Sequence, residues 1–450
     1  MAMIRWCPAQ PKIQGDVIIR MSNVQSVLRV SGVDTLNSGS EDMVGVFIDQ
    51  PKVGEFDGVF TLTIEGWCIP RSCPAIGILV YSGDDCLADA PMIPRPDVQI
   101  AVQDAPFAMH SGFSIPLNVL CLPKCGSITV RAKLVTGKQV VICLINFEIS
   151  VASLNRKDTL KPVIVFSVGR SGSTAVMKIL SSHPEISAHA KYPLENRYAQ
   201  YMYHALRVLS SLPSSHSPEM MTSFSSRRAT VGANPSFGYY SDLGDFYQNT
   251  YVPSLVNDYT GLIDKFYRSI EGKDPTKVKY FAEKSLQDQY LVNTLEKIDG
   301  SKKIILLRDP RDIMVSIKKF NERNGFLGFG ADRVNSFAEH AELIRSALEW
   351  HLNVAGRDDP SSFIIKYEEM FSSCKLHIER LFSFLGVSCD EEFIKQAAEA
   401  VEFGDSDGLI HSTSSSYELS QRRWILDLSA EQKEICIDVF GGILKELGYN

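Results

Sequence analysis

The chain has 450 residues, of which 44% are apolar and 22% charged, with a formal net charge of −7. This is the composition of an ordinary globular protein of two or three domains, and the negative charge argues against nucleic-acid binding through a general basic surface. No apolar run reaches the length of a membrane-spanning helix, and residues 1–10 lack the charged-then-apolar pattern of a signal peptide. We therefore expect a cytoplasmic protein without a transmembrane segment, and leave open a leader or anchor outside these residues.

Residues from about 15 to 150 alternate apolar and polar positions in short runs that are separated by Gly, Pro, Asn and Asp. This alternation is typical of an antiparallel β-sandwich. Strands are predicted at Asp16–Arg20, Val59–Trp67, Ile76–Tyr81, Ser127–Leu134 and Gln139–Ile149.

Seven of the ten cysteines lie in the first 143 residues, at Cys7, Cys68, Cys73, Cys86, Cys121, Cys125 and Cys143. The pairs Cys68/Cys73 and Cys121/Cys125 could form two halves of a zinc site, but the spacings are loose and no His pair accompanies them. We favour reduced, mostly buried thiols and expect no metal.

Three short signatures in the same region resemble a β-sandwich module that accompanies some bacterial glycan-modifying enzymes. They are Gly66-Trp67, Arg95-Pro96-Asp97-Val98 and Ser111-Gly112-Phe113. A generic sandwich with one core Trp and two turns explains the same residues equally well. Because residues 155–158 are typical of a linker, we predict a β-sandwich accessory domain at residues 1–155 and a second domain at residues 156–450.

From Lys161 onward, short apolar strands alternate with amphipathic helices, which predicts a parallel sheet with flanking helices. The Ser-rich stretch between Ser210 and Pro235 is expected to be a mobile loop. Asp242–Ile270 is aromatic and has a helical period, so its Phe and Tyr side chains either line a substrate cleft or belong to the core.

The strand predicted at Val163–Phe166 runs directly into a glycine-containing loop and then a helix. The loop and helix start are Ser167, Val168, Gly169, Arg170, Ser171, Gly172, Ser173 and Thr174. Backbone N–H groups of such a loop and of a helix N-terminus point at one place and favour an anion there. Because Gly169 and Gly172 let the backbone approach closely, the sequence predicts a phosphate site.

The loop differs from that of kinases and nucleoside triphosphatases, which reads Gly-x-x-x-x-Gly-Lys-Ser/Thr. Here Ser173 follows Gly172, and the cation comes earlier, at Arg170. No Asp-ended strand stands out as a partner for the Thr174 hydroxyl in holding magnesium. We therefore expect a phosphate site without a bound metal, with a tight strand–helix turn as the alternative.

Lys302–Leu307 is a second short buried strand, followed by Arg308-Asp309-Pro310-Arg311-Asp312. Pro310 suits the start of a helix, whose apolar face is Ile313, Ile317 and Phe320. Ligands lie at the carboxyl ends of strands in a parallel sheet, which is where Arg308 is placed. Ser316 follows two turns into the helix. A guanidinium and a hydroxyl in this arrangement can bind a phosphate monoester, so Arg308 and Ser316 are predicted to do so.

Val165–Thr174 and Arg308–Phe320 resemble the two nucleotide-binding signatures of the sulfotransferase family. In that family the first loop holds the 5′-phosphosulfate of 3′-phosphoadenosine-5′-phosphosulfate (PAPS), and an Arg with a Ser eight residues later holds the 3′-phosphate, matching Arg308 and Ser316. Other segments resemble the family in chain order, namely His183-Pro184, Tyr280–Ser285, Ile364–Glu369, Phe384-Leu385-Gly386 and His411–Leu428. The resemblance covers residues 160–450 and implies the P-loop-like sulfotransferase fold.

Two positions depart from the cytosolic members of this family. Those members often carry Lys at the position of Arg170, and a late Arg-Lys-Gly that is missing here. Arg422 or Arg423 is expected to take over the grip of that late motif on the 3′-phosphate. The pattern is nearer to the bacterial and Golgi-type branches.

The resemblance implies metal-free, in-line transfer of a sulfuryl group from PAPS to an acceptor hydroxyl. Arg170 would then stabilise the leaving phosphate, while donors to the 5′-phosphate would come from Gly169, Ser171, Gly172, Ser173 and Thr174. Lys284 would face the sulfuryl oxygens, although without the family context it could be an ordinary surface lysine. As general base, Glu195 is preferred, and His189 is the second choice.

Two other classes of function are weighed against this one. The absent Walker lysine argues against a P-loop kinase or nucleoside triphosphatase, and the presence of Arg170, Lys284, Arg308 and Ser316 argues against a degenerate enzyme that serves as a glycan-binding scaffold. A glycan hydroxyl is the favoured acceptor, with a lipid, a small natural product and a protein tyrosine left open. We expect no nucleic-acid partner, and the resemblance permits a homodimer.

Overall fold

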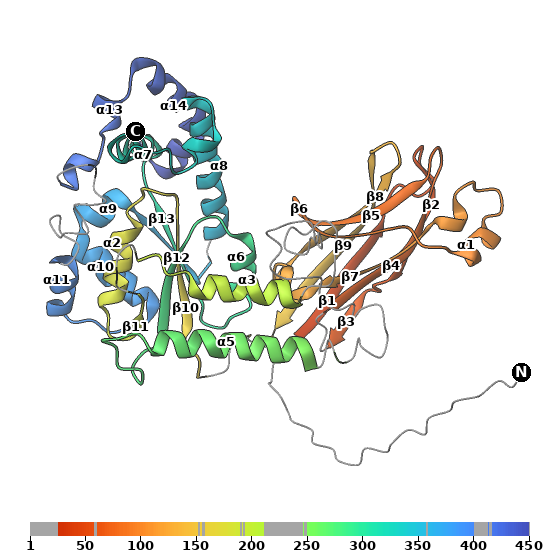
Figure 1. Cartoon of the computed structure of the whole chain (residues 1–450), viewed down its shortest axis with the longest axis horizontal. Coiled ribbons are helices and arrows are strands. Elements are labelled where there is room, and N and C mark those ends of the chain that lie inside the picture. The colour runs from red at the N-terminus through yellow and green to blue at the C-terminus, as the bar shows by residue number, and fades with distance from the viewer. Residues whose placement is uncertain are drawn as a thin grey trace, which may run out of the picture.

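The computed structural model describes residues 26–57, 61–151, 154, 158–189, 191, 194–210, 246, 250–356, 359–399, 413 and 416–449. Figure 1 shows a strand-rich N-terminal part in red to orange beside a helix-rich part that continues to the C-terminus in blue. The strand predicted at Asp16–Arg20, linker residues 155–157 and the loop predicted after Ser210 lie outside the described residues. Within them, no helix has the length and apolarity that crossing a membrane requires.

The N-terminal part is an antiparallel sandwich, as predicted. One sheet has the strand order β3-β1-β9-β8-β5-β6 and the other β2-β4-β7. The alternation seen in the sequence places every second side chain of β8, from Ile128 to Leu134, in the core between the sheets. The strands are β1 Ser26–Thr35, β2 Met43–Gln50, β3 Gly54–Asp57, β4 Thr61–Pro70, β5 Ala75–Ser82, β6 Asp85–Ala90, β7 Gly112–Asn118, β8 Cys125–Leu134 and β9 Gln139–Val151. Short helices are α1 Pro96–Ala101, η1 Ala108–His110 and η2 Val119–Cys121.

The second part contains the predicted parallel sheet, in the order β11-β12-β10-β13-β14. Its strands are β10 Lys161–Ser167, β11 Ile186–Ser187, β12 Tyr280–Ser285, β13 Lys302–Leu307 and β14 Ser362–Lys366. The described pairings between neighbouring strands are all parallel. Continuous apolar runs such as 163–166 and 304–307 form the central strands because helices cover both faces of the sheet.

Helices α2, α10 and α11 pack on one face of the sheet, and α3, α5, α6, α7, α8 and α14 on the other. The helices are α2 Ser173–Ser182, α3 Tyr198–Ser210, α5 Val252–Arg268, α6 Gln289–Leu295, α7 Pro310–Asn324, α8 Phe337–Ala355, α9 Tyr367–Ser372, α10 Cys374–Leu385, α11 Glu391–Glu399, α13 Trp424–Asp427 and α14 Ala430–Leu447, with η6 Ala331–Arg333 and η7 Glu418–Ser420. In α5, Val256, Ile263 and Tyr267 are buried, so the aromatic stretch predicted there contributes to the core.

The two parts meet through apolar contacts and a buried cation. Leu120 and Leu154 belong to the same buried cluster as the helices of the α/β part. Lys297, just after α6, is 4% exposed, and its ammonium donates to the backbone carbonyls of Leu122 and, at 3.0 Å, Asn293. Asn118 at the end of β7 donates to Ser210 Oγ at 2.9 Å. The division of the chain at residues 155 and 156 stays a prediction.

Candidate active site at the carboxyl ends of the parallel strands

The carboxyl ends of β10, β12 and β13 lie at one edge of the sheet. Phe166 pairs with Ser285, and Ser167 pairs with Leu306, so the three strands end at the same level. The residues that follow are the predicted phosphate loop and Arg308, and Lys284 is the last residue but one of β12. The sheet therefore brings together the segments that the sequence analysis singled out.

The loop after β10 has the backbone conformation of an anion-binding turn. Gly172 has φ +91° and caps α2 without any side-chain hydrogen bond to the first turn, so the N–H groups there point toward the loop. A Cβ at Gly172 would lie 2.6 Å from the Tyr367 ring, and one at Gly169 would lie 2.4 Å from the Phe329 ring. Arg170, with φ +69°, adopts the left-handed conformation without being glycine. Both glycines are thus required by close packing of aromatic rings.

Two polar atoms at this edge are buried and lack a hydrogen-bond partner in the described part of the chain. They are Ser171 Oγ and Arg308 Nε, in residues that are 0% and 4% exposed. Buried polar atoms are nearly always bonded, because desolvating them without compensation is unfavourable. Both donors therefore suit a ligand with acceptor oxygens, such as a phosphate.

Arg308 joins three segments at the end of β13. Its guanidinium donates at 2.7 Å to the carbonyl of Arg170 and at 2.7 Å to the carbonyl of Ser420. The same group lies 4.2 Å from the centre of the Tyr367 ring, and Tyr367 Oη is 2.8 Å from Ser420 Oγ. Arg308 is therefore fixed between the phosphate loop and the C-terminal segment.

Ser316, on α7, contacts Arg170 directly and is linked to Arg423 through Thr413. Arg170 Nε donates to Ser316 Oγ at 3.2 Å, and the Arg170 guanidinium is 4.6 Å from the centre of the Phe320 ring. Thr413 Oγ1 is 3.4 Å from Ser316 Oγ and accepts from Arg423 at 2.9 Å. Arg170, Ser316 and Arg423 thus form one cluster, in which Thr413 is a member that the sequence analysis did not identify.

Asp312 holds the segment that carries Arg423. Its carboxylate accepts the backbone N–H of Arg422 at 2.7 Å and that of Trp424 at 3.1 Å. Burial raises the pKa of Asp312 to about 6, although the nearby Arg308 and these N–H donors act in the opposite direction. The first turn of α7 therefore positions the late basic residues beside the phosphate loop.

Lys284 and Glu195 form an ion pair at the end of β12. Lys284 Nζ lies 2.7 Å from Glu195 Oε1, and the Lys284 side chain is 8% exposed while that of Glu195 is 43% exposed. Burial lowers the pKa of Lys284, and the charges of Arg197 and Arg170 add to that effect against the favourable contact with Glu195. The positive charge of Arg170, on the loop after the neighbouring strand, therefore acts at Lys284.

The other candidate base lies near the same edge. His189 is partly buried and follows β11 by two residues. Glu195 is also 4.0 Å from Arg197. The assignments of Glu195 and His189 as the base both stay predictions.

Glu283 is a buried carboxylate that the sequence analysis did not single out. It is 1% exposed and accepts the backbone N–H groups of Ala199 at 2.6 Å and Gln200 at 3.1 Å, as well as the hydroxyl of Tyr267. Burial raises its pKa to about 7, and these donors oppose the rise. Glu283 thus holds the N-terminus of α3 against β12, beside Lys284.

A His–Asp pair also lies near the end of β12. His204 Nε2 is 2.7 Å from Asp288 Oδ2, and Gln200 donates to the same oxygen at 2.6 Å. Burial alone would raise the pKa of Asp288, but the contacts with His204, the Leu291 N–H and Gln200 outweigh it and lower that pKa. A histidine oriented by a carboxylate can accept a proton, so this pair is a third candidate base.

Comparison with known proteins gives the following matches. A family model described as the sulfotransferase domain matches residues 160–409, which is more than half of the chain. Similar solved structures include the sulfotransferase domain of the Synechococcus PCC 7002 olefin synthase, with 19% identity and a TM-score of 0.38 over 66% of this chain and 98% of that one. Another is mouse sulfotransferase SULT7A1 complexed with PAP, with 13% identity and a TM-score of 0.35 over 64% of this chain and 88% of that one.

A third solved structure is sulfotransferase STF9 from Mycobacterium avium, with 12% identity and a TM-score of 0.33 over 64% of this chain and 77% of that one. No curated protein matched the sequence. Within the described residues, no group of three or more His, Cys, Asp or Glu side chains is placed to hold a metal ion.

Proposed function

This chain belongs to the sulfotransferase family, and from that premise we propose that it transfers a sulfuryl group from PAPS to an acceptor hydroxyl. One observation carries the proposal. At the carboxyl ends of β10 and β13, the unpartnered Ser171 Oγ and Arg308 Nε lie buried beside the uncapped N-terminus of α2. Such donors suit a ligand with two phosphate groups, which PAPS provides.

In this proposal each end of the donor has its own residues. The backbone of Gly169–Thr174 and the Ser171, Ser173 and Thr174 hydroxyls bind the 5′-phosphosulfate. Arg308, Ser316 and Arg423 bind the 3′-phosphate. The contact of Arg170 Nε with Ser316 Oγ at 3.2 Å supports the closeness of the two subsites.

The chemistry we propose needs cations on the donor and a base on the acceptor. Lys284 neutralises the sulfuryl oxygens, and Arg170 stabilises the charge that develops on the leaving phosphate. As the acceptor oxygen attacks sulfur, its proton passes to the base, the bond from sulfur to the bridging oxygen breaks, and 3′-phosphoadenosine-5′-phosphate (PAP) leaves. The Lys284–Glu195 distance of 2.7 Å supports Glu195 as base, since a hydroxyl bonded to Glu195 would adjoin a sulfuryl group held by Lys284.

His189 and the His204–Asp288 pair are the alternative bases in this scheme. For the acceptor we propose a glycan hydroxyl, on the basis of the resemblance of the sandwich signatures to modules of glycan-modifying enzymes.

Calorimetry of PAP binding in EDTA tests the donor assignment, with ATP and magnesium as the comparison ligand. We expect PAP to bind without metal at about micromolar concentration. Ser316→Ala removes one hydrogen bond to a charged group and should weaken PAP binding by about tenfold to a hundredfold. Arg345→Ala, which changes a partly exposed arginine on α8, is the matched control and should bind PAP normally.

Preference for ATP with magnesium, or failure of the native chain to bind PAP, would refute the proposal. Equal PAP affinities of the native chain and the Ser316→Ala variant would show that Ser316 does not contribute to PAP binding. That result would not contradict PAPS as the sulfuryl donor.

A further inference from the structure

The outer face of the three-stranded sheet β2-β4-β7 has an unusual composition. Along each strand, alternate residues point into the sandwich core, including Val46, Ile64 and Ile115. The residues between them therefore lie on the outer face. These outward residues include Phe47, Asp49, Glu65, Trp67 and Ser114.

Phe47 and Trp67 make an aromatic row across this face. They are cross-strand partners, and their ring centres are 6.3 Å apart with planes inclined by 22°. A Cβ at Gly45 would lie 3.0 Å from the six-membered ring of Trp67, so that ring lies against the strand backbone. Phe47 is 49% exposed. The two rings therefore form an aromatic platform. Solvent reaches its Phe47 part, while Trp67 is half-buried and also packs against the small apolar cluster that contains Ile69 and Val98.

A row of polar groups runs beside the platform. Glu65 pairs with Ser114 across the strands, and Ser114 Oγ donates to Glu65 Oε1 at 2.8 Å. Glu65 lies two residues before Trp67 on the same face of β4, so the polar row is about 7 Å from the aromatic row. This spacing matches the width of one pyranose ring with its hydroxyl groups. Asp49 lies at a register shift of β2 and joins the row through its contact with Arg95.

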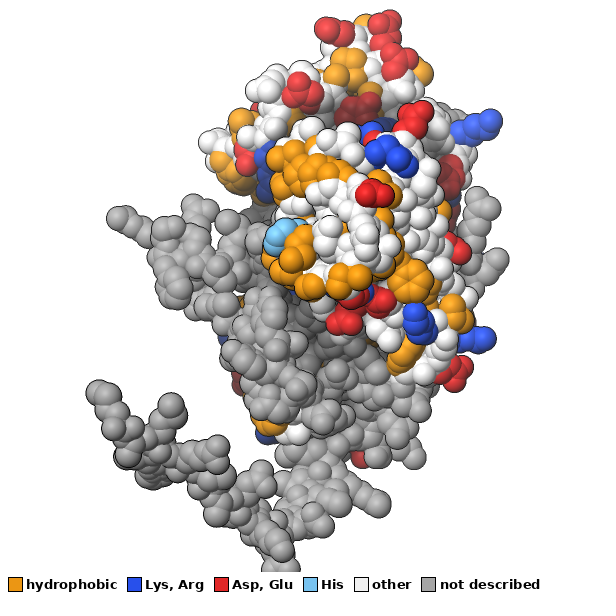
Figure 2. Space-filling model, turned by 90° about the vertical axis from the view of Figure 1, so that its right-hand side faces the viewer, with side chains coloured by type: hydrophobic (Ala, Val, Ile, Leu, Met, Phe, Trp, Pro, Cys, Tyr) orange, Lys and Arg blue, Asp and Glu red, His pale blue; other side chains and the backbone are white. Residues whose placement is uncertain are grey.

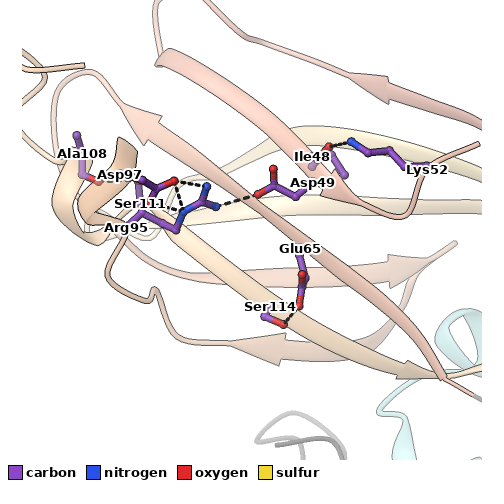
Figure 3. A network of polar contacts seen from close by, with 9 residues as sticks. All are labelled: Ile48, Asp49, Lys52, Glu65, Arg95, Asp97, Ala108, Ser111 and Ser114. Carbon is purple, nitrogen blue, oxygen red and sulfur yellow. Dashed lines mark hydrogen bonds and ion pairs between the residues drawn. The ribbon is translucent and has the colours of Figure 1, made fainter. Parts of the chain in front are cut away.

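Arg95 fixes one end of the polar row. Its guanidinium donates to Asp49 at 2.9 Å and to Asp97 at 2.8 Å, and Figure 3 shows it between these two carboxylates. A Cβ at Gly112 would lie 2.5 Å from Arg95 Cγ, so the Arg95 stem covers that glycine. The donors and acceptors of the row are thus held in place before any ligand arrives.

We propose that this face, the Phe47–Trp67 platform with its polar row, binds a neutral saccharide. Aromatic rings pack against the C–H face of a sugar ring. The hydroxyl groups of the sugar donate hydrogen bonds to carboxylates, accept them from a guanidinium, and do either with a serine hydroxyl. The Lys52 ammonium lies over the Phe47 ring, 5.3 Å from its centre, and adds a hydrogen-bond donor there.

Charge and polarity argue against the other kinds of ligand. Asp49, Glu65 and Asp97 outnumber the cations Arg95 and Lys52, which disfavours sulfated or other anionic chains. A protein partner would call for a continuous apolar patch. On the end of the molecule that carries α1, Figure 2 shows hydrophobic side chains interspersed with charged ones.

Affinity electrophoresis of the full chain tests this inference, with dextran, galactomannan, β-1,3-glucan and xyloglucan in separate gels and heparin as the anionic comparison. No donor is present, so the result is independent of sulfuryl transfer. We expect at least one neutral polysaccharide to retard the native chain. Phe47→Ala should weaken that binding by about tenfold, which corresponds to about 1.4 kcal/mol, whereas Phe47→Tyr keeps the ring and should bind as the native chain does.

Ile76→Ala is the matched control, because Ile76 is also 49% exposed but belongs to β5 of the other sheet. Thermal unfolding of the Phe47→Ala variant at the temperature of the native chain would show that it is folded. Three outcomes would overturn the inference: no neutral polysaccharide retards the chain, heparin alone does so, or Phe47→Ala behaves like Ile76→Ala.

Discussion

Replacement of Arg308 by alanine should destabilise the α/β part strongly, whether or not a donor is bound. The guanidinium is 4% exposed and makes two hydrogen bonds of 2.7 Å, to the carbonyls of Arg170 and Ser420. A hydrogen bond from a charged group contributes about 1.5–3 kcal/mol, and replacement by alanine removes this donor from a buried and a partly buried carbonyl. We therefore expect Arg308→Ala to lower the free energy of unfolding by about 3–5 kcal/mol.

Arg308→Lys should have about half this effect, because an ammonium on a single stem reaches one carbonyl but not both. Urea unfolding followed by circular dichroism at 222 nm measures the loss, since all the described α-helices except the short α1 lie beyond residue 160. Arg345→Ala is the matched control. Arg345 also has two short partners, Glu342 at 2.8 Å and Glu349 at 2.5 Å, but its side chain is 34% exposed.

Solvent screens such a surface pair, so Arg345→Ala should leave the unfolding free energy nearly unchanged. Equal losses of unfolding free energy in Arg308→Ala and Arg345→Ala would refute the reasoning. Burial would then not strengthen the contribution of the Arg308 hydrogen bonds to stability. A loss in Arg308→Lys as large as in Arg308→Ala would show that the fork of Arg308, rather than its charge, is the whole contribution.

Three further predictions concern the phosphate loop, the donor and the core. Gly169→Ala places a Cβ 2.4 Å from the Phe329 ring, so it should weaken PAP binding in calorimetry, and adding Phe329→Ala should restore it; no rescue would mean that the ring is not the obstacle. Lys284→Ala should weaken PAPS binding by about tenfold or more and leave PAP binding unchanged. Equal losses of affinity for both ligands would show that Lys284 does not contact the sulfuryl group. Burial lowers the pKa of His351 from 6.5 to about 4 in the folded chain, so the unfolded chain takes up a proton first as the pH falls. The free energy of unfolding should therefore decrease by about 3 kcal/mol between pH 6.5 and pH 4. Urea titrations at pH 7 and pH 4 should show that His351→Leu removes this fall, and an unchanged fall would exclude His351 as its source.

Much of the α/β part could be predicted because its signals are local. The strand predicted at Lys302–Leu307 has those bounds in the structure, and α7 begins at Pro310 with Asp309 as its cap. Hydrophobic runs, a proline at a helix start and glycines in a turn act over a few residues, so their spacing in the sequence is sufficient to locate them.

Contacts between distant segments could not be predicted in the same way. Lys284 and Glu195 meet because the backbone after β11 passes the end of β12, and no sequence pattern sets that path. The same holds for His204 with Asp288, and for Thr413, which bridges Ser316 and Arg423. In a strand with one face exposed, a charged residue such as Glu283 would be expected to point to solvent. Both faces of β12 are covered, however, and Glu283 is buried where the N-terminus of α3 supplies hydrogen-bond donors to its carboxylate.

The buried ammonium of Lys297 bears on how this chain can be rearranged by evolution or by engineering. Leu120 and Leu122, whose carbonyls accept from it, precede residue 160, where the family match begins, and Asn293 follows it. A chain cut at that boundary would leave the cation short of partners and uncover the apolar surface around α6. The sandwich therefore cannot be exchanged for another module, or removed, without redesigning the helix it covers.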